Sequence, residues 1–144
     1  MTIGTWSGSC YCRAIGFRYE TALSPAEWSV RACQCGFCRK HDALSVSDPG
    51  GSVSFSAAEP GALVRYRFGL KTADFLLCRN CGVYVGAVIS APAGRFGIIN
   101  LHALDEPPAG LRAAQPVSYD GESTTGRTGR RAERWTPVTD LPRE

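Results

Sequence analysis

Residues 78–82 read Cys78-Arg79-Asn80-Cys81-Gly82, and this short stretch decides much of what the chain can become. A C-x-x-C turn brings two sulfur atoms round one tetrahedral metal ion, and the glycine that follows relaxes the backbone. All seven cysteines of the 144 residues stand in clusters of this kind. The other two clusters are Cys10-Tyr11-Cys12 and Cys33-Gln34-Cys35-Gly36-Phe37-Cys38. Their spacing favours metal ligation over disulfide bonding.

The seven cysteines divide into four and three. Cys10 and Cys12 with Cys78 and Cys81 would make a closed four-sulfur site that ties distant segments together and contributes to folding. Cys33, Cys35 and Cys38 would hold a second ion and leave one coordination position open. Spacing alone also allows the first two clusters to join, or a purely structural second site that His41 or His102 completes. Zinc suits thiolates in a redox-quiet role, whereas an iron–sulfur cluster normally requires four cysteines.

Short apolar stretches broken by glycine and proline predict a mainly β fold with little helix. The expected strands cover residues 14–19, 28–35, 44–46, 53–55, 63–68, 75–77, 83–89 and 96–101, and each cysteine cluster should lie at a strand end. Ser24-Pro25-Ala26-Glu27 has the residue order of a capped helix start, so one short helical turn is expected there. Residues 126–135 form either a short helix or a loose tail.

The length predicts a single domain over residues 1–144, with a basic C-terminal tail from about residue 122. The formal net charge of +3 is a weak argument for nucleic-acid binding, because thiolates at two zinc sites would offset it. No apolar run approaches the length of a membrane span, and the first nine residues have no secretory pattern. An odd number of clustered cysteines without an export signal predicts a cytoplasmic protein with reduced thiols.

The three clusters, in this order and at these distances, resemble the glutathione-dependent formaldehyde-activating enzyme family, also called the centromere protein V family, over about residues 8–105. The resemblance implies a zinc-bearing β-tent fold with two zinc ions. The structural ion would bind Cys10, Cys12, Cys78 and Cys81, and the labile ion would bind Cys33, Cys35 and Cys38. It also implies a carbon–sulfur lyase that joins formaldehyde to the glutathione thiol, giving S-hydroxymethylglutathione. Gln34 departs from the family, in which this position is often histidine.

Cys33, Cys35 and Cys38 are therefore the candidate catalytic residues. Arg39 and Lys40, which follow them directly, are candidates to attract the carboxylates of glutathione. The rival interpretation is a non-catalytic zinc module that binds a nucleic acid or an acidic partner through its arginine-rich tail. That tail contains Arg127, Arg130, Arg131 and Arg134, followed by Trp135. A solvated helix face anchored by the tryptophan is the simpler interpretation of the same residues.

Overall fold

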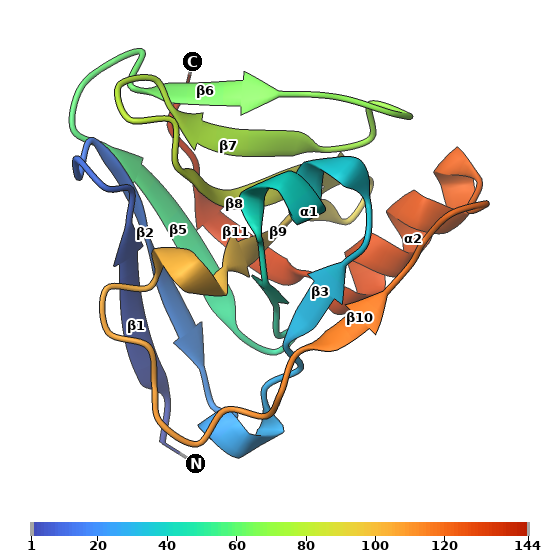
Figure 1. Cartoon of the computed structure of the whole chain (residues 1–144), viewed down its shortest axis with the longest axis horizontal. Helices are drawn as coiled ribbons and strands as arrows, with labels where there is room; N and C mark the ends of the chain where they lie inside the picture. Colours follow the sequence, from blue (N-terminus) through green and yellow to red (C-terminus); the bar gives the residue numbers. More distant parts are fainter. Residues whose placement is uncertain (1, 144) are drawn as a thin grey trace.

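The computed structural model describes residues 2–143 and shows a mainly β protein (Figure 1). Its strands are β1 (Gly4–Ser9), β2 (Ile15–Thr21), β3 (Arg31–Cys33), β4 (Ser45–Val46), β5 (Ser52–Ala57), β6 (Leu63–Tyr66), β7 (Asp74–Cys78), β8 (Tyr84–Ala91), β9 (Gly94–Asn100), β10 (Gln115–Val117) and β11 (Thr136–Asp140). The helices are α1 (Gly36–His41) and α2 (Thr124–Arg134), with 3-10 turns at Pro25–Glu27 and Leu101–Ala103. The predicted fold class, mainly β with little helix, is confirmed.

The strands form one branched sheet, and β9 is its branch point. The main path runs β1-β2-β5-β11-β9-β4-β3-β10, while β8 pairs with the other side of β9 and continues to β7 and β6. Most neighbours are antiparallel, but β11 lies parallel to β5 and β10 lies parallel to β3. Figure 1 shows the β1-β2-β5 wall on the left, the β6-β7 hairpin at the top, and the short strands β3 and β10 at the lower right.

The central hairpin β8-β9 separates two apolar clusters. On one face, Val85 and Ile99 join the larger core, which also contains Tyr19, Trp28 and Phe55. On the other face lies a smaller cluster made of Cys38, Ala43, Ala73, Phe75, Tyr84, Ala87, Ile89, Ile98 and Trp135. Burial on both faces explains why residues 84–89 of β8 are continuously apolar rather than alternating.

Most of the expected strands are present, and the 3-10 turn after Ser24 is capped as expected. Glu27 Oε1 accepts hydrogen bonds from the backbone N–H of Ser24 at 3.0 Å and from its hydroxyl at 2.8 Å. The strand expected over residues 28–35 was wrong in extent, because only Arg31–Cys33 is extended and the chain turns into α1 three residues later. His102 is exposed on a 3-10 turn whose other residues, Leu101 and Ala103, are buried, and it lies outside the strand that was expected to end at residue 101.

The C-terminal segment is part of the fold and not a loose tail. Helix α2 begins after Ser123, whose hydroxyl accepts a hydrogen bond from the N–H of Gly126 at 3.0 Å. Trp135 follows the helix and is 5% exposed within the smaller cluster. Strand β11 then inserts between β5 and β9. Within residues 2–143, no helix has the length and apolar character that crossing a membrane requires.

Candidate zinc sites and cavity

The seven cysteines come together in two groups. In each group, all the sulfur atoms lie within 4.8 Å of one another. The first group contains Cys10, Cys12, Cys78 and Cys81, and the second contains Cys33, Cys35 and Cys38. The structure thus brings the first and third clusters of the sequence together. It keeps the middle cluster separate, so the alternative that joined the first two clusters is wrong.

Two tight turns build the four-cysteine group. Cys10 and Cys12 lie in the β1–β2 connection, beyond the end of β1, and Cys78 and Cys81 flank the β7–β8 turn. Gly82 has a φ of 79°, a backbone conformation that suits glycine. Its N–H donates to the carbonyl of Cys78 at 2.9 Å, which closes the turn.

The donor set of this group fits a closed zinc site. The Sγ atoms of Cys10 and Cys12 are 3.7 Å apart, and those of Cys12 and Cys78 are 3.5 Å apart. Sulfur atoms bound at 2.3 Å to a tetrahedral ion would lie about 3.8 Å from each other. The Sγ atom of Cys78 also accepts backbone N–H bonds from Asn80 at 3.3 Å and from Cys81 at 3.4 Å. Such bonds orient a thiolate toward a metal ion.

The three-cysteine group is built at the start of helix α1. Cys33 ends β3, Cys35 is the N-cap of α1, and Cys38 lies in its first turn. The Sγ atom of Cys35 accepts a hydrogen bond from the N–H of Cys38 at 3.4 Å. No histidine or carboxylate among residues 2–143 joins this group. In particular, His41 lies at the far end of α1 with its ring 4.4 Å from that of Phe37.

Within this second group, the thiols of Cys33 and Cys38 differ in acidity. A hydrogen bond from Cys38 lowers the pKa of Cys33 to about 5, although burial opposes the shift, and Arg130 adds to it. The pKa of Cys38 is raised, first because it donates this bond and then because it is buried. Three clustered thiols with one position left over are the donor set of an open zinc site.

These three cysteines line a cavity of about 230 Å³. Its apolar lining comes from Phe68, Ala73, Phe75, Ile98, Val117 and Trp135. Its polar lining comes from Ser45, Thr72, Tyr119 and Asp120, together with the arginines Arg31, Arg127, Arg130 and Arg131. A mostly apolar cavity with a few convergent polar groups is the usual form of a small-molecule site.

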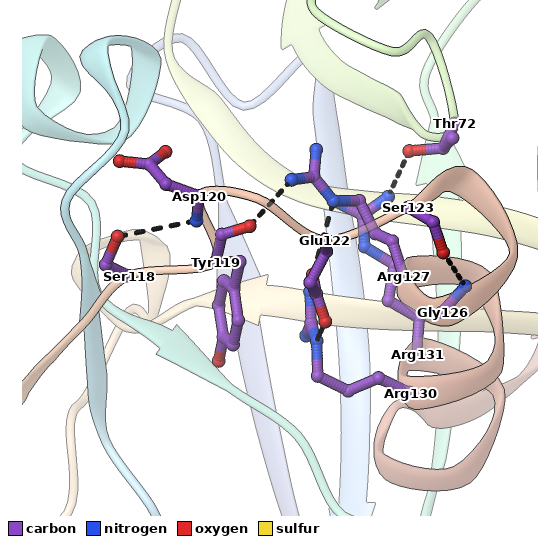
Figure 2. A network of polar contacts seen from close by, with 10 residues as sticks. All are labelled: Thr72, Ser118, Tyr119, Asp120, Glu122, Ser123, Gly126, Arg127, Arg130 and Arg131. Carbon is purple, nitrogen blue, oxygen red and sulfur yellow. Dashed lines mark hydrogen bonds and ion pairs between the residues drawn. The ribbon is translucent and has the colours of Figure 1, made fainter.

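Helix α2 supplies three of the four arginines (Figure 2). Arg127 and Arg130 both bond to the carboxylate of Glu122, at 3.3 Å and at 2.8 Å. Arg127 also donates to the carbonyl of Tyr119 at 3.0 Å, and the Arg130 guanidinium lies 3.5 Å from the centre of the Tyr119 ring. This network holds the segment before α2 against the helix and forms one wall of the cavity.

The sequence singled out these arginines but did not predict where they lie. It favoured a solvated helix face, whereas Arg131 is 9% exposed and faces the cavity. Arg31 was not considered. The amphipathic spacing of residues 127, 130, 131 and 134 was the available signal, but it gives no information about which face is covered.

Arg39 and Lys40 lie elsewhere. Both side chains are exposed on α1, in its last turn, and neither lines the cavity. Their role in attracting glutathione therefore stays a prediction. The cavity itself obtains its positive charge from other residues.

A comparison with protein families matches residues 5–119 to the family described as glutathione-dependent formaldehyde-activating enzyme. A search of solved structures finds a crystal structure of a Rhodobacter sphaeroides protein with a TM-score of 0.59 and 24% sequence identity. The similarity covers 77% of this chain and 99% of that one, and at this identity it concerns the fold alone. No curated protein matches. Because the family match covers all seven cysteines and most of the sheet, the chain belongs to the glutathione-dependent formaldehyde-activating enzyme family.

Proposed function

We propose that the protein is a carbon–sulfur lyase that acts on the adduct of glutathione, or a similar thiol, with a small aldehyde such as formaldehyde. In the direction of synthesis, a bond forms between the thiol sulfur and the aldehyde carbon. The carbonyl double bond becomes a single bond, and the thiol proton ends on its oxygen. The reverse reaction breaks the carbon–sulfur bond. The observation that carries the proposal is the group Cys33, Cys35 and Cys38 at the wall of a cavity.

The three thiols fit a zinc ion, and the second cysteine group fits another. At the cavity, Cys33, Cys35 and Cys38 would hold the ion and leave a position free for a ligand. A zinc ion bound there would lower the pKa of a thiol ligand and would polarise a carbonyl group. Cys10, Cys12, Cys78 and Cys81 would hold the second, structural ion.

The rest of the cavity suits a thiol adduct. Phe68, Phe75 and Trp135 give it apolar walls that exclude water, which protects a hemithioacetal and strengthens electrostatic interactions inside. The positively charged side chains of α2 suit a ligand with carboxylates. Arg39 and Lys40, exposed nearby in sequence, would add long-range attraction for the same anion.

The rival function, binding of a nucleic acid through the tail, has less support. Arg127 and Arg130 are engaged with Glu122, and Arg131 is buried. Phosphate contacts along a nucleic acid require cations that project from the surface. Of the four arginines of α2, only Arg134 is exposed.

The test is turnover of ¹³C-labelled formaldehyde with glutathione, followed by exchange NMR on the zinc-loaded protein. Because the reaction also proceeds without catalyst, the measured quantity is the exchange rate above that of buffer. We expect the wild type to accelerate exchange by at least about tenfold, and C35S to lose the acceleration while it keeps the circular dichroism spectrum of the wild type. A wild-type rate equal to that of buffer would refute the proposal.

A further inference from the structure

The cavity is lined by a buried cation, Arg131, for which the described residues provide no anionic partner. Arg131 is 9% exposed, and no carboxylate of residues 2–143 forms an ion pair with it. Its Nη1 donates to Thr72 Oγ1 at 2.8 Å, and its guanidinium lies 4.9 Å from the centre of the Trp135 ring. Its Nε is buried without a hydrogen-bond partner in the described chain. Buried charges of this kind are normally paired, so an unpaired one indicates a ligand.

The surroundings leave this positive charge uncompensated. Burial, with Arg130 and Arg127 next to it, lowers the pKa of Arg131 to about 10, so the side chain remains charged at neutral pH. Glu122 lies near, but it is already bonded by Arg127 and Arg130. Arg31, elsewhere in the cavity lining, forms no ion pair with a carboxylate of the described chain and donates instead to Ser47 Oγ at 2.8 Å.

A zinc ion bound to the three cysteines would not remove the excess of positive charge around the cavity. Three thiolates and one Zn²⁺ carry one net negative charge, and Asp120 and Glu122 add two more. The four arginines around the cavity carry four positive charges. One positive charge is left, so the cavity favours an anionic ligand.

From this geometry we infer that Arg131 binds the glycyl carboxylate of glutathione while the cysteinyl sulfur lies at Cys33, Cys35 and Cys38. The inference rests on the proposed function, and it names the side chain that recognises the thiol substrate. The glycyl end of glutathione carries a lone carboxylate, which matches a guanidinium that has no anionic partner among residues 2–143. The γ-glutamyl end also carries an ammonium group, which the arginines would repel and which Asp120, exposed at the lining, would accept.

This assignment makes α2 the element that determines specificity. The family match ends at residue 119, whereas Arg131 and its neighbours lie beyond it. The thiol chemistry thus belongs to the part of the chain that the family shares, and the recognition of the carboxylate belongs to a segment outside the match.

The test is calorimetry on the zinc-loaded protein with two ligands, glutathione and its glycyl ethyl ester. We expect the wild type to bind the ester about tenfold to a hundredfold more weakly than glutathione, the usual effect of losing one charged hydrogen-bonded pair. In R131Q, glutathione should bind as weakly as the ester does. R134Q, the same change at an exposed arginine of the same helix, should keep the wild-type ratio.

The ratio of the two affinities separates recognition from structure. If the ethyl group only clashed with the cavity wall, the ratio would persist in R131Q, and the inference would be overturned. Should R131Q fail to fold, R131K is the second variant, because it keeps a positive charge and the aliphatic stem. A lysine cannot donate two parallel hydrogen bonds to a carboxylate as a guanidinium does, so the preference of R131K for glutathione over the ester should be smaller than that of the wild type. An unchanged ratio in R131K would overturn the inference.

Binding of the two ligands to the wild type alone also tests the inference. Equal affinity for glutathione and its ester would overturn the role of Arg131 and leave the proposed function standing. Failure of the wild type to bind either ligand would overturn the proposed function, and this inference with it.

Discussion

Arg131 on α2 donates a hydrogen bond from Nη1 to Thr72 Oγ1 at 2.8 Å, although 59 residues separate them. The bond joins the C-terminal helix to the segment that leads into β7. Both residues line the cavity beside the three cysteines. The position of the guanidinium is therefore set by contacts from two distant parts of the chain.

Removing the acceptor should weaken this link. We expect T72V, which has nearly the same shape, to lower the free energy of unfolding by about 1–2 kcal/mol, because a buried guanidinium loses a hydrogen-bond partner. T72S keeps the hydroxyl and should stay within about 0.5 kcal/mol of the wild type. Urea denaturation of the zinc-loaded proteins measures both. Equal stability of T72V and T72S would show that the bond contributes nothing.

Metal removal should proceed in two stages. Four sulfur atoms would enclose one zinc ion, whereas three would leave the other open to a competing ligand. A mild chelator should therefore remove about one equivalent of zinc while the β-sheet signal in circular dichroism persists. Release of both ions together, with loss of that signal, would contradict the division into a structural and an open site.

The two cysteine groups should respond differently to mutation. C78S removes a candidate ligand that would join the β7–β8 turn to the β1–β2 turn, so metal-binding free energy that stabilises the fold would be lost. We expect its melting temperature to fall by about 10 °C or more. C35S changes a group built within a single short segment and should shift the melting temperature much less. Similar large losses in both variants would contradict this expectation.

Glu122 should make the docking of α2 sensitive to acid. Hydrogen bonds from Arg130 lower the pKa of this carboxylate below its ordinary value. Its stabilising effect is therefore complete above the unfolded-state pKa and is lost as pH falls through the lower folded-state value. We expect E122Q to lose about 1 kcal/mol at pH 7. Urea denaturation between pH 7 and pH 3 should show this difference shrinking toward zero, and a difference independent of pH would disprove the assignment.

The thiol should be essential for binding at the open site. A thiol loses its proton when it becomes a metal ligand, whereas the thioether of S-methylglutathione has no proton to lose. We expect S-methylglutathione to bind much more weakly than glutathione, and glutathione to bind more tightly as pH rises toward the pKa of its thiol. Calorimetry with both ligands measures this. Equal affinities would mean that sulfur does not reach the metal.

Local spacing alone predicted the two C-x-x-C turns, the mainly β fold class and the capped turn after Ser24. These features depend on residues within a few positions of each other, so the sequence displays them directly. The short helix α1 was missed because its six residues include one candidate ligand, Cys38, and an aromatic residue, and so short a segment carries little periodicity.

The sequence by itself determined the ligand types, the size of the clusters and the family to which they belong. Only the tertiary structure decided which clusters come together, because Cys10 and Cys78 approach each other through the folding of the sheet and not through sequence proximity. It likewise decided that Arg131 faces a cavity and not solvent. The helical pattern of α2 carries no information about which distant residues will cover it, whereas contacts with Thr72 and Trp135 bury that arginine without an anionic partner among residues 2–143.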